Sequence, residues 1–323
     1  MLFKSDSFSD CYVDLIRHVY EKPEFESAPR GLKIRECLGV KFQIMNPLDR
    51  LLYVPGRNFS ITYTIAENLW YLLGENDTSW ITNYAPFWGN ISDDGVTANS
   101  AYGARIFKPH PRIDNGMQTQ WELAFNELKR DKDSRRAVIH IHTPEDARVA
   151  VKDVPCTLTL QFLVRDDQLH MIVSMRSSDL ILGITYDIPA FTIFQELMAL
   201  KLGVGIGTYT HVSNSLHIYE RDFKMCEEIL DSGHTTGPEM PRMSSEPNVK
   251  WLNGLQWSAK SCSSEKDLVN LFATSLTTSD IDEYTMDWAK ILLAHRAGKL
   301  KLQDRKTEYL KSTKFSGYHQ FLR

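Results

Sequence analysis

The stretch Asp153-Val154-Pro155-Cys156-Thr157-Leu158, followed by Met175-Arg176-Ser177-Ser178-Asp179, holds the most reactive group of side chains in the sequence. Cys156 follows a proline and leads into alternating apolar residues, which predicts a thiol at the edge of a β-strand. A thiol at such an edge suits a nucleophile better than a thiol inside a core. The second segment ends another apolar run, and its arginine, serines and aspartate indicate an anion site beside the thiol.

Further short signals follow these two segments. They are Leu182-Gly183, Tyr186-Asp187 and His211-x5-His217-x-Tyr219. Together with Pro155-Cys156 and Arg176-Ser177-x-Asp179, they resemble the thymidylate synthase superfamily in order and spacing. The resemblance begins near Arg30 and fades after about Asp222. It implies an α/β (α+β) fold with a large mixed β-sheet flanked by helices, in a homodimer packed through the sheets.

The composition is that of a globular protein. The 323 residues are 42% apolar and 11% aromatic, which is enough for a sizeable core, and we expect one catalytic domain over residues 1–323. Residues 223–323 lie outside the resemblance. A formal net charge of −4 with both signs interspersed indicates neither a nucleic-acid groove nor a membrane-binding face, so the expected substrate is small.

The five cysteines are scattered through the chain and include no CxxC pair. That pattern argues against a disulfide framework and against a zinc site, and it fits a reducing cytoplasm. No apolar run approaches the ~18 residues that a membrane span needs, and the N-terminus carries no export signal. We therefore expect a cytoplasmic protein without a bound metal.

The spacing of apolar residues predicts both helices and strands. Helices are expected at residues 10–21, 65–74, 121–130, 190–202 and 281–297, and strands at 38–44, 137–141, 158–162, 169–176 and 208–212. Residues 80–103 and 231–247 have the composition of loops. The glycine-rich segment 203–207 follows a helix and opens none, so we reject a dinucleotide site there.

The resemblance assigns a chemistry to the thiol. A thiolate that adds to carbon 6 of a pyrimidine nucleotide makes carbon 5 nucleophilic enough to attack a one-carbon unit. The resemblance implies that Cys156 is this thiol, that Arg176 lowers its pKa, and that the cosubstrate is 5,10-methylenetetrahydrofolate. Glu67 matches the glutamate of a Glu-x-x-Trp-x-Leu-x-Gly signature and would be the general acid/base, while Tyr102 would approach the reacting carbon. Outside this family, Glu67 would be an exposed or paired carboxylate.

A second group of residues would bind the nucleotide. It consists of Arg30, Arg135, Arg136, Arg176, Ser177, Ser178, Asp187, His217 and Tyr219. In the family, the pair that matches Arg135 and Arg136 reaches across the subunit interface to the partner's phosphate. The alternatives are solvated arginines at Arg30 and at the pair, and a core His/Tyr contact in place of the sugar site.

A third group would hold the folate. It consists of Trp80, Trp88, Asp179, Leu182, Gly183 and Tyr186. The resemblance places Asp179 toward the pterin, and the aromatic residues would form stacking walls. The alternative is that the aromatic residues of segment 80–103 form a satellite core.

Asp187 carries the prediction about the base. Thymidylate synthases have an asparagine at this position, which suits uracil, whereas a carboxylate can accept two hydrogen bonds from the amino group and protonated ring nitrogen of cytosine. The aspartate resembles that of the cytidylate hydroxymethylases, so we expect dCMP or CMP as the substrate, with a lean toward dCMP. The alternative is that Asp187 caps a helix that begins near Pro189.

The transferred carbon has two possible fates. It can take a hydride and become a methyl group, or take water and become a hydroxymethyl group. Thr157 stands where synthases carry histidine, and we take it as support for the hydroxymethyl product. Two rivals stay open: a cytidylate or uridylate C5-methyltransferase, which would accumulate dihydrofolate, and a non-catalytic nucleotide- or RNA-binding descendant, whose activity would survive Cys156→Ser.

Overall fold

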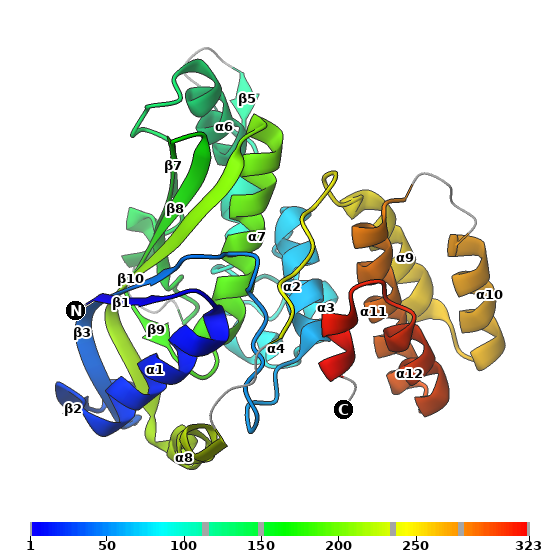
Figure 1. The fold of residues 1–323 in the computed structure, drawn as a ribbon. Helices are drawn as coiled ribbons and strands as arrows, with labels where there is room; N and C mark the ends of the chain where they lie inside the picture. The colour runs from blue at the N-terminus through cyan, green and yellow to red at the C-terminus, as the bar shows by residue number, and fades with distance from the viewer. Residues whose placement is uncertain (1, 112–115, 148–151, 233–236, 277–280, 322–323) are drawn as a thin grey trace.

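The structure is a computed structural model that describes residues 2–111, 116–147, 152–232, 237–276 and 281–321 (Figure 1). Its strands are β1 (Leu2–Ser5), β2 (Phe25–Ser27), β3 (Ile34–Ile44), β4 (His110–Pro111), β5 (Met117–Gln118), β6 (Val138–His140), β7 (Thr157–Arg165), β8 (Gln168–Met175), β9 (Ser178–Asp179) and β10 (Gly205–Tyr219). In these residues the main sheet has the order β1-β3-β10-β8-β7-β6, with β2 paired to β3 and β9 to β10. β10 is parallel to β8 and antiparallel to β3, so the sheet is mixed, as predicted.

The helices are α1 (Phe8–Glu21), α2 (Ile61–Leu72), α3 (Thr78–Ile81), α4 (Trp88–Ile91), α5 (Tyr102–Phe107), α6 (Gln120–Arg130), α7 (Ile184–Leu202), α8 (Phe223–Ser232), α9 (Val249–Ser261), α10 (Glu265–Leu276), α11 (Glu283–Lys299) and α12 (Gln303–Lys311). Helices α1, α5, α6 and α7 contact strands of the sheet. Short 3₁₀ turns are η1 (Pro29–Gly31), η2 (Pro144–Ala147), η3 (Glu220–Asp222) and η4 (Ser316–Phe321). Figure 1 shows α2 between α7 and the C-terminal helices α9–α12.

Helix α7 is buried because it contacts strands β8 and β10 on one side and α2 on another. This explains why its apolar residues, such as Phe191 and Phe194, face nearly every direction. The helix ends at Gly203, whose φ of 69° is easy for glycine and costly for other residues. A continuous cluster of buried apolar side chains extends from Phe8 to Tyr318 and includes α11.

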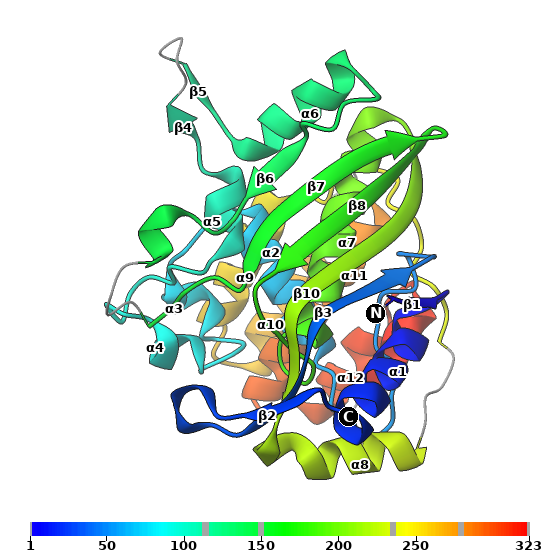
Figure 2. The same ribbon diagram turned by 90° about the vertical axis from the view of Figure 1, so that its left-hand side faces the viewer.

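The other face of the sheet is uncovered in the described chain. Figure 2 shows β6, β7, β8, β10 and β3 in front of the helices, with no helix over them. Side chains on this face are largely polar, and Gln43 donates hydrogen bonds of 3.2 Å to Thr208 and to Thr210. The described helices therefore leave this face of the sheet open.

Several elements differ from the predicted ones. The helix predicted at 190–202 begins six residues earlier, at Ile184. The prediction missed these six residues because the polar side chains of the first turn interrupt the apolar pattern. Segment 80–103 is predicted as a loop but contains the end of α3, all of α4 and the start of α5, and these helices are too short for a periodic signal. The strand predicted at 208–212 lies in the first half of the 15-residue β10.

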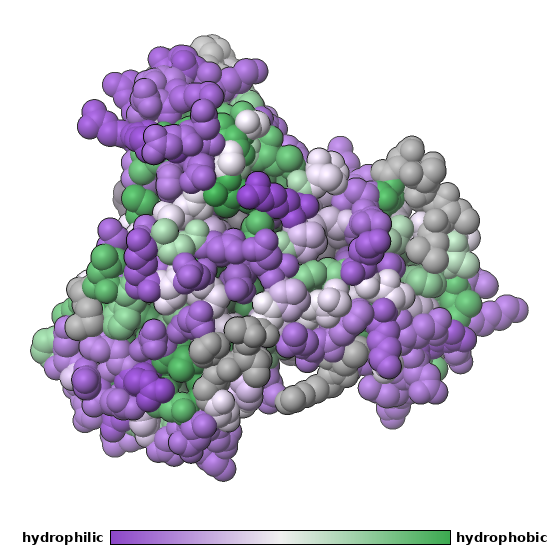
Figure 3. Space-filling model, in the orientation of Figure 1, coloured by the Kyte–Doolittle hydropathy of each residue, from purple (hydrophilic) through white to green (hydrophobic). Residues whose placement is uncertain are grey.

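The face seen in Figure 3 is mostly hydrophilic, with apolar side chains in small patches. In the described ranges, no helix combines the length and the apolar character needed to cross a bilayer.

Candidate active site

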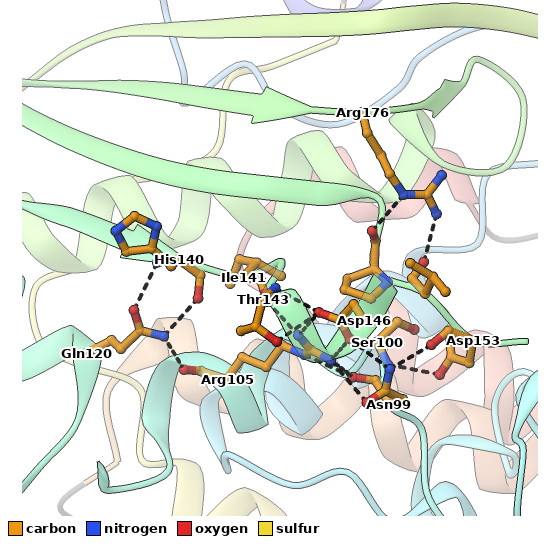
Figure 4. A network of polar contacts seen from close by, with 12 residues as sticks. Asn99, Ser100, Arg105, Gln120, His140, Ile141, Thr143, Asp146, Asp153 and Arg176 are labelled. Carbon is orange, nitrogen blue, oxygen red and sulfur yellow. Dashed lines mark hydrogen bonds and ion pairs between the residues drawn. The ribbon is translucent and has the colours of Figure 1, made fainter. Parts of the chain in front are cut away.

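The predicted nucleophile, Cys156, and Arg176 come from neighbouring strands. Cys156 is half-buried just before β7, and Arg176 directly follows β8, which pairs with β7. The Arg176 guanidinium donates to the carbonyls of Val154 and Pro155 at 2.9 and 3.0 Å (Figure 4). Its Nη2 lies 3.6 Å from the Cys156 Sγ. The hairpin thus holds a cation directly beside the thiol.

The pKa of Cys156 corrects one part of the sequence prediction. Burial raises the pKa of this thiol above its ordinary value, and the Arg176 charge is the largest influence that lowers it. The charges of Asp187 and Asp153 also raise the pKa of Cys156, whereas the charge of Arg30 lowers it. Arg176 therefore lowers the pKa of Cys156, as predicted, but the effect of burial is larger in the free protein.

A polar network holds the segment before Cys156 (Figure 4). The Asp153 carboxylate accepts from the Ser100 backbone N–H at 2.9 Å, and the Asn99 side-chain amide donates to the Asp153 carbonyl at 2.8 Å. The same amide donates to Asp146 at 3.0 Å, and Asp146 forms a two-pronged ion pair with Arg105 at 2.6 and 2.7 Å. This ties the nucleophile segment to the start of α5, which carries Tyr102.

Glu67 lies in α2 as a buried carboxylate. Burial raises the pKa of Glu67 to about 7, against hydrogen bonds from Tyr63 and Tyr71 that lower it. The Tyr63 hydroxyl donates to Glu67 Oε1 at 2.5 Å and accepts from Trp88 Nε1 at 3.0 Å. A carboxyl group with a pKa near neutrality can both take and give a proton, as a general acid/base must.

Asp187 lies in the first turn of α7 rather than at its cap, which is Gly183. The alternative that Asp187 caps a helix near Pro189 is therefore wrong. No hydrogen bond joins its carboxylate to any other residue that the structure describes, although it is partly buried. Burial raises the pKa of Asp187 well above its ordinary value, and the charges of Glu67 and Asp179 add to this rise. A carboxylate in this condition is available to a ligand with hydrogen-bond donors.

Tyr102 completes the cluster. Its ring is buried between Tyr71 and Phe191, with centroids 5.4 and 5.8 Å away. Burial raises the pKa of Tyr102 well above its ordinary value, and the charges of Asp187, Cys156 and Glu67 act in the same direction. The next residue is Gly103, where an added Cβ would lie 2.2 Å from the Tyr71 carbonyl oxygen. Only glycine fits there, and this close packing of α5 on α2 brings Tyr102 to the other three groups.

Of the residues predicted to bind the nucleotide, His217 and Tyr219 lie on β10, whereas Arg30, Arg135 and Arg136 are exposed. Asp179 in β9 pairs with His217 in β10, and the Tyr219 ring stands perpendicular to the His217 ring at 5.1 Å. Arg30 is exposed in η1 with a left-handed φ of 55°, yet its charge still reaches Cys156. Arg135 and Arg136 are exposed before β6 and form no ion pair with other described residues.

The two serines after Arg176 face different ways. Ser177 is half-buried, whereas the hydroxyl of Ser178 is buried and lies 3.2 Å from His211 Nε2. The Ser178 side chain therefore points into the core, which argues against its predicted contact with the nucleotide.

The expected folate wall lies at the start of α7. Asp179 accepts from the backbone N–H groups of Ile181 and Leu182, which shapes the turn into Gly183. Leu182 is 55% exposed, an apolar side chain without cover. The Tyr186 ring is perpendicular to Tyr63 at 4.7 Å. An uncovered leucine beside aromatic rings and a carboxylate suits a flat, partly polar ring system, so these residues fit a folate.

The two predicted tryptophans have different surroundings. Trp88 lies inside the site, because its Nε1 donates to the Tyr63 hydroxyl. Trp80 is buried, and its Nε1 donates to Asn253 of α9 at 3.0 Å. Trp80 thus belongs to the packing of α3 on α9, which favours the satellite core over a stacking wall for this residue. In the described part of the chain, no group of three His, Cys, Asp or Glu side chains is arranged to hold a metal ion.

Sequence reasoning missed Tyr63 and the Asp146–Arg105 pair. Tyr63 precedes Glu67 by four residues, and this spacing puts both side chains on one face of a helix, so the signal was available. Asp146 and Arg105 are 41 residues apart, and no local pattern links them.

The chain is similar to known proteins of one family. The family model for thymidylate synthase matches residues 10–259, a wider span than the sequence motifs covered. Three phage proteins named deoxyuridylate hydroxymethyltransferase are similar: those of Bacillus phage SP01 (33% identity, 70% of this chain), Delftia phage PhiW-14 (31%, 62%) and Pseudomonas phage M6 (32%, 61%). The aligned region spans 61%, 57% and 56% of those relatives' lengths, in the same order.

The fold has a solved counterpart. The thermostable thymidylate synthase A of Bacillus subtilis superimposes with a TM-score of 0.61 at 20% identity, over 72% of this chain and 87% of that chain. This confirms the predicted fold class.

Proposed function

Because this chain belongs to the thymidylate synthase family, we propose that it is a cytidylate 5-hydroxymethyltransferase. It would transfer a one-carbon unit from 5,10-methylenetetrahydrofolate to carbon 5 of dCMP or CMP and add water to give the 5-hydroxymethyl nucleotide. The names of the three phage relatives support the hydroxymethyl outcome. Those names specify deoxyuridylate, so the choice of cytosine depends on this chain's own residues.

The observation that carries the proposal is the unpartnered carboxyl group of Asp187 beside Cys156 and Tyr102. Its raised pKa means that the free protein can hold a proton there. On binding, that proton can pass to the ring nitrogen of cytosine, and the resulting carboxylate accepts hydrogen bonds from that nitrogen and from the amino group. Uracil has a carbonyl where cytosine has the amino group, so it would face an ionised acceptor.

The other side chains divide the remaining work. The Cys156 thiolate adds to carbon 6, and Arg176 stabilises its charge and faces the phosphate with Ser177 and Arg30. Glu67, held by Tyr63, would take a proton from the water that attacks the transferred carbon. His217 and Tyr219 would hold the sugar hydroxyl.

The folate would supply the one-carbon unit when bound. The residues that would hold it are Trp88, Asp179, Leu182, Gly183 and Tyr186. Each belongs to the turn into α7 or to the aromatic contacts around Tyr63.

We also propose a homodimer in the cytoplasm, with residues 1–323 of each chain as one catalytic domain. The uncovered polar face of the sheet supports pairing of two copies through that face (Figure 2). Arg135 and Arg136 are exposed and do not contact Cys156 or Arg176 of their own chain. They would bind the partner's phosphate. The unpaired state of all five cysteines fits a reducing compartment.

The test is product identification. Purified protein is incubated with methylenetetrahydrofolate and dCMP, CMP or dUMP, and the nucleotide product is analysed by mass spectrometry while absorbance monitors dihydrofolate. We expect a cytidylate product that has gained CH2O, without dihydrofolate, and no product from Cys156→Ala. A gain of CH2 with dihydrofolate would indicate a methyltransferase. Activity that persists in Cys156→Ala would overturn the assignment of the nucleophile.

A further inference from the structure

Thr157 directly follows Cys156, and a β-bulge sets the direction of its side chain. Thr157 is paired with Met175 of β8, whereas Thr159 is paired with Ser174, so β7 carries one extra residue between these two pairs. Side chains alternate along a regular strand, which would put Thr157 on the open face of the sheet together with Thr159. Because of the extra residue, Thr157 instead lies on the side of Met175, and both side chains are buried. Bulges beside active sites often redirect one side chain in this way.

The hydroxyl of Thr157 faces that of Tyr102 in α5. Burial raises the pKa of Tyr102 well above its ordinary value, whereas the Thr157 hydroxyl lowers it as a hydrogen-bonding neighbour. In the free protein the Thr157 Oγ1 is nevertheless buried without a hydrogen bond of ordinary geometry to another described residue. Such a hydroxyl costs free energy, so a position that needed only shape would be filled better by valine. Hydrogen bonds of a catalytic site are often long in the free protein and shorten when the substrate binds.

Tyr102 and Glu67 border the same space. Helix α5 packs directly on α2 at Gly103, where an added Cβ would meet the Tyr71 backbone. The Tyr71 ring stacks on Tyr102 with centroids 5.4 Å apart, and Tyr71 also hydrogen-bonds to Glu67. A water molecule in this space therefore has a carboxylate and a phenol oxygen as acceptors for its two hydrogens.

We propose that Thr157 is a positioning residue for the water that adds to the transferred carbon, and that it acts through Tyr102. This inference rests on the proposed function. The Tyr102 hydroxyl donates its hydrogen to the Thr157 Oγ1, which turns an oxygen lone pair of Tyr102 toward the water. The water donates one hydrogen to this lone pair and gives the other to Glu67.

The atoms and electrons of this step balance without another reactant. The water oxygen forms a bond to the exocyclic methylene carbon, and the released proton goes to the Glu67 carboxylate. The electron pair of the methylene double bond closes the double bond between carbons 5 and 6, and the bond from carbon 6 to sulfur breaks with its electrons leaving on the Cys156 thiolate. In the competing reaction the same carbon takes a hydride and becomes a methyl group, so a well-placed water favours the hydroxymethyl product.

The test separates water addition from the steps before it. In a single turnover with enzyme in excess, dCMP labelled with tritium at carbon 5 releases tritium on one-carbon transfer, and the 5-hydroxymethyl product then reports water addition. Thr157→Val removes the hydroxyl and keeps the shape, and we expect near-normal tritium release but about tenfold slower product formation, the effect of one hydrogen bond. Thr157→Ser keeps the hydroxyl and should restore most of the rate.

A second comparison tests whether Thr157 acts through Tyr102. Tyr102→Phe removes the phenol oxygen, so adding Thr157→Val to Tyr102→Phe should slow product formation no further. Full additivity of the two changes would contradict the inference.

Thr192→Val is the matched control, the same change at another buried threonine. The Thr192 hydroxyl donates only to carbonyls of its own helix α7, at Ile188 and Pro189, among the described residues. This variant should keep the wild-type rate of product formation relative to tritium release.

Three results would overturn the inference and leave the proposed reaction standing. They are an unchanged rate of product formation relative to tritium release in Thr157→Val, a Thr157→Ser variant as slow as Thr157→Val, and loss of tritium release in Thr157→Val, which would place Thr157 in an earlier step. Absence of tritium release in the wild type would instead count against the proposed function.

Discussion

In the proposed reaction, recognition of the base depends on Asp187. Its carboxylate accepts hydrogen bonds but, once ionised, donates none, whereas the amide of Asn does both. In Asp187→Asn we expect the ratio of kcat/KM for dCMP over dUMP to fall by at least about tenfold, since an unpaired neutral polar group costs about 1–3 kcal/mol and a charged one more.

The matched control is Asp179→Asn. That carboxylate lies in the same site but accepts from the backbone N–H groups of Ile181 and Leu182. It should lower both kcat/KM values without changing their ratio. If Asp187→Asn behaves in this same way, Asp187 does not recognise the base.

Tyr63 sets the proton affinity of Glu67. The Tyr63 hydrogen bond lowers a carboxyl pKa that burial raises to about 7. If ionised Glu67 activates water, kcat should rise with pH through about 7. Tyr63→Phe removes a hydrogen bond to the charged form, so the rise should move to higher pH. The measurement is kcat for hydroxymethyl product between pH 5 and pH 9.

A suitable control is Tyr20→Phe, the same chemical change at a surface hydroxyl that bonds to Glu227. Its pH profile should match the wild type. A Tyr63→Phe profile that also matches would mean that the Tyr63 hydroxyl has no influence on the catalytic proton.

Sequence motifs predicted which titratable residues of the candidate site lie together, but not the direction or the burial of their side chains. Cys156, Asp187 and Glu67 stand in spaced patterns, and the structure brings them together around Tyr102. The direction of the Ser178 hydroxyl depends on the pairing of β9 with β10, which a motif does not encode. The net rise in the Cys156 pKa depends on burial, which is equally hidden in the sequence.

At the scale of elements, the segment before β7 depends on the ion pair of Asp146 and Arg105. Both side chains are largely buried, at 2% and 15% exposure. Asp146→Ala leaves Arg105 without its anion, and we expect a loss of about 3 kcal/mol in the free energy of unfolding. A lower kcat should accompany it because the Cys156 segment loses its anchor. Urea unfolding and product formation measure the two effects.

Glu265→Ala provides the comparison, since Glu265 pairs with Arg305 at 2.7 Å on the exposed surface. Loss of that pair should cost less than about 1 kcal/mol and leave kcat unchanged. Equal losses in the two variants would show that the buried network has no special role in holding the nucleophile.

Elements with a strong apolar period were predictable, and those set by tertiary contacts were not. The helix predicted at 65–74 corresponds to α2, with a shift at each end. The start of α7 was missed because Thr185 and Asp187 interrupt its apolar pattern while the fold buries the helix between the sheet and α2. Short helices such as α3 and α4 persist through packing and caps rather than through periodicity.

The proposed dimer can be tested by mixing two inactive variants. If Arg136 serves the partner's site, Arg136→Ala and Cys156→Ala should each be inactive and regain activity when mixed. Random exchange should restore about a quarter of wild-type activity, since half of the dimers then carry one intact site of two. The readout is product formation in a mixture with subunit exchange demonstrated.

Arg130→Ala is the control, because Arg130 is an exposed arginine that pairs with Glu127 of its own chain. It should remain active alone. If exchanged mixtures of the first two variants stay inactive, the pair Arg135-Arg136 is a solvated charge run and the site lies within one chain.

The overall architecture was predictable from the resemblance, but its C-terminal part was not. One helix was expected after residue 248, at 281–297, and it corresponds to α11. The others, α9, α10 and α12, carry mixed polar and apolar residues, and their place beside α2 follows from the shared core cluster rather than from any local pattern.

The proposed enzyme prefers cytosine to uracil. The most direct measurement is a competition in which dCMP and dUMP at equal concentration share one reaction with methylenetetrahydrofolate and 18O-labelled water. Mass spectrometry of the products then gives the ratio of the two kcat/KM values. We predict 18O-labelled 5-hydroxymethyl-dCMP in large excess over any uridylate product. A product mixture dominated by 5-hydroxymethyl-dUMP would show that the protein is a uridylate enzyme and that Asp187 does not select cytosine.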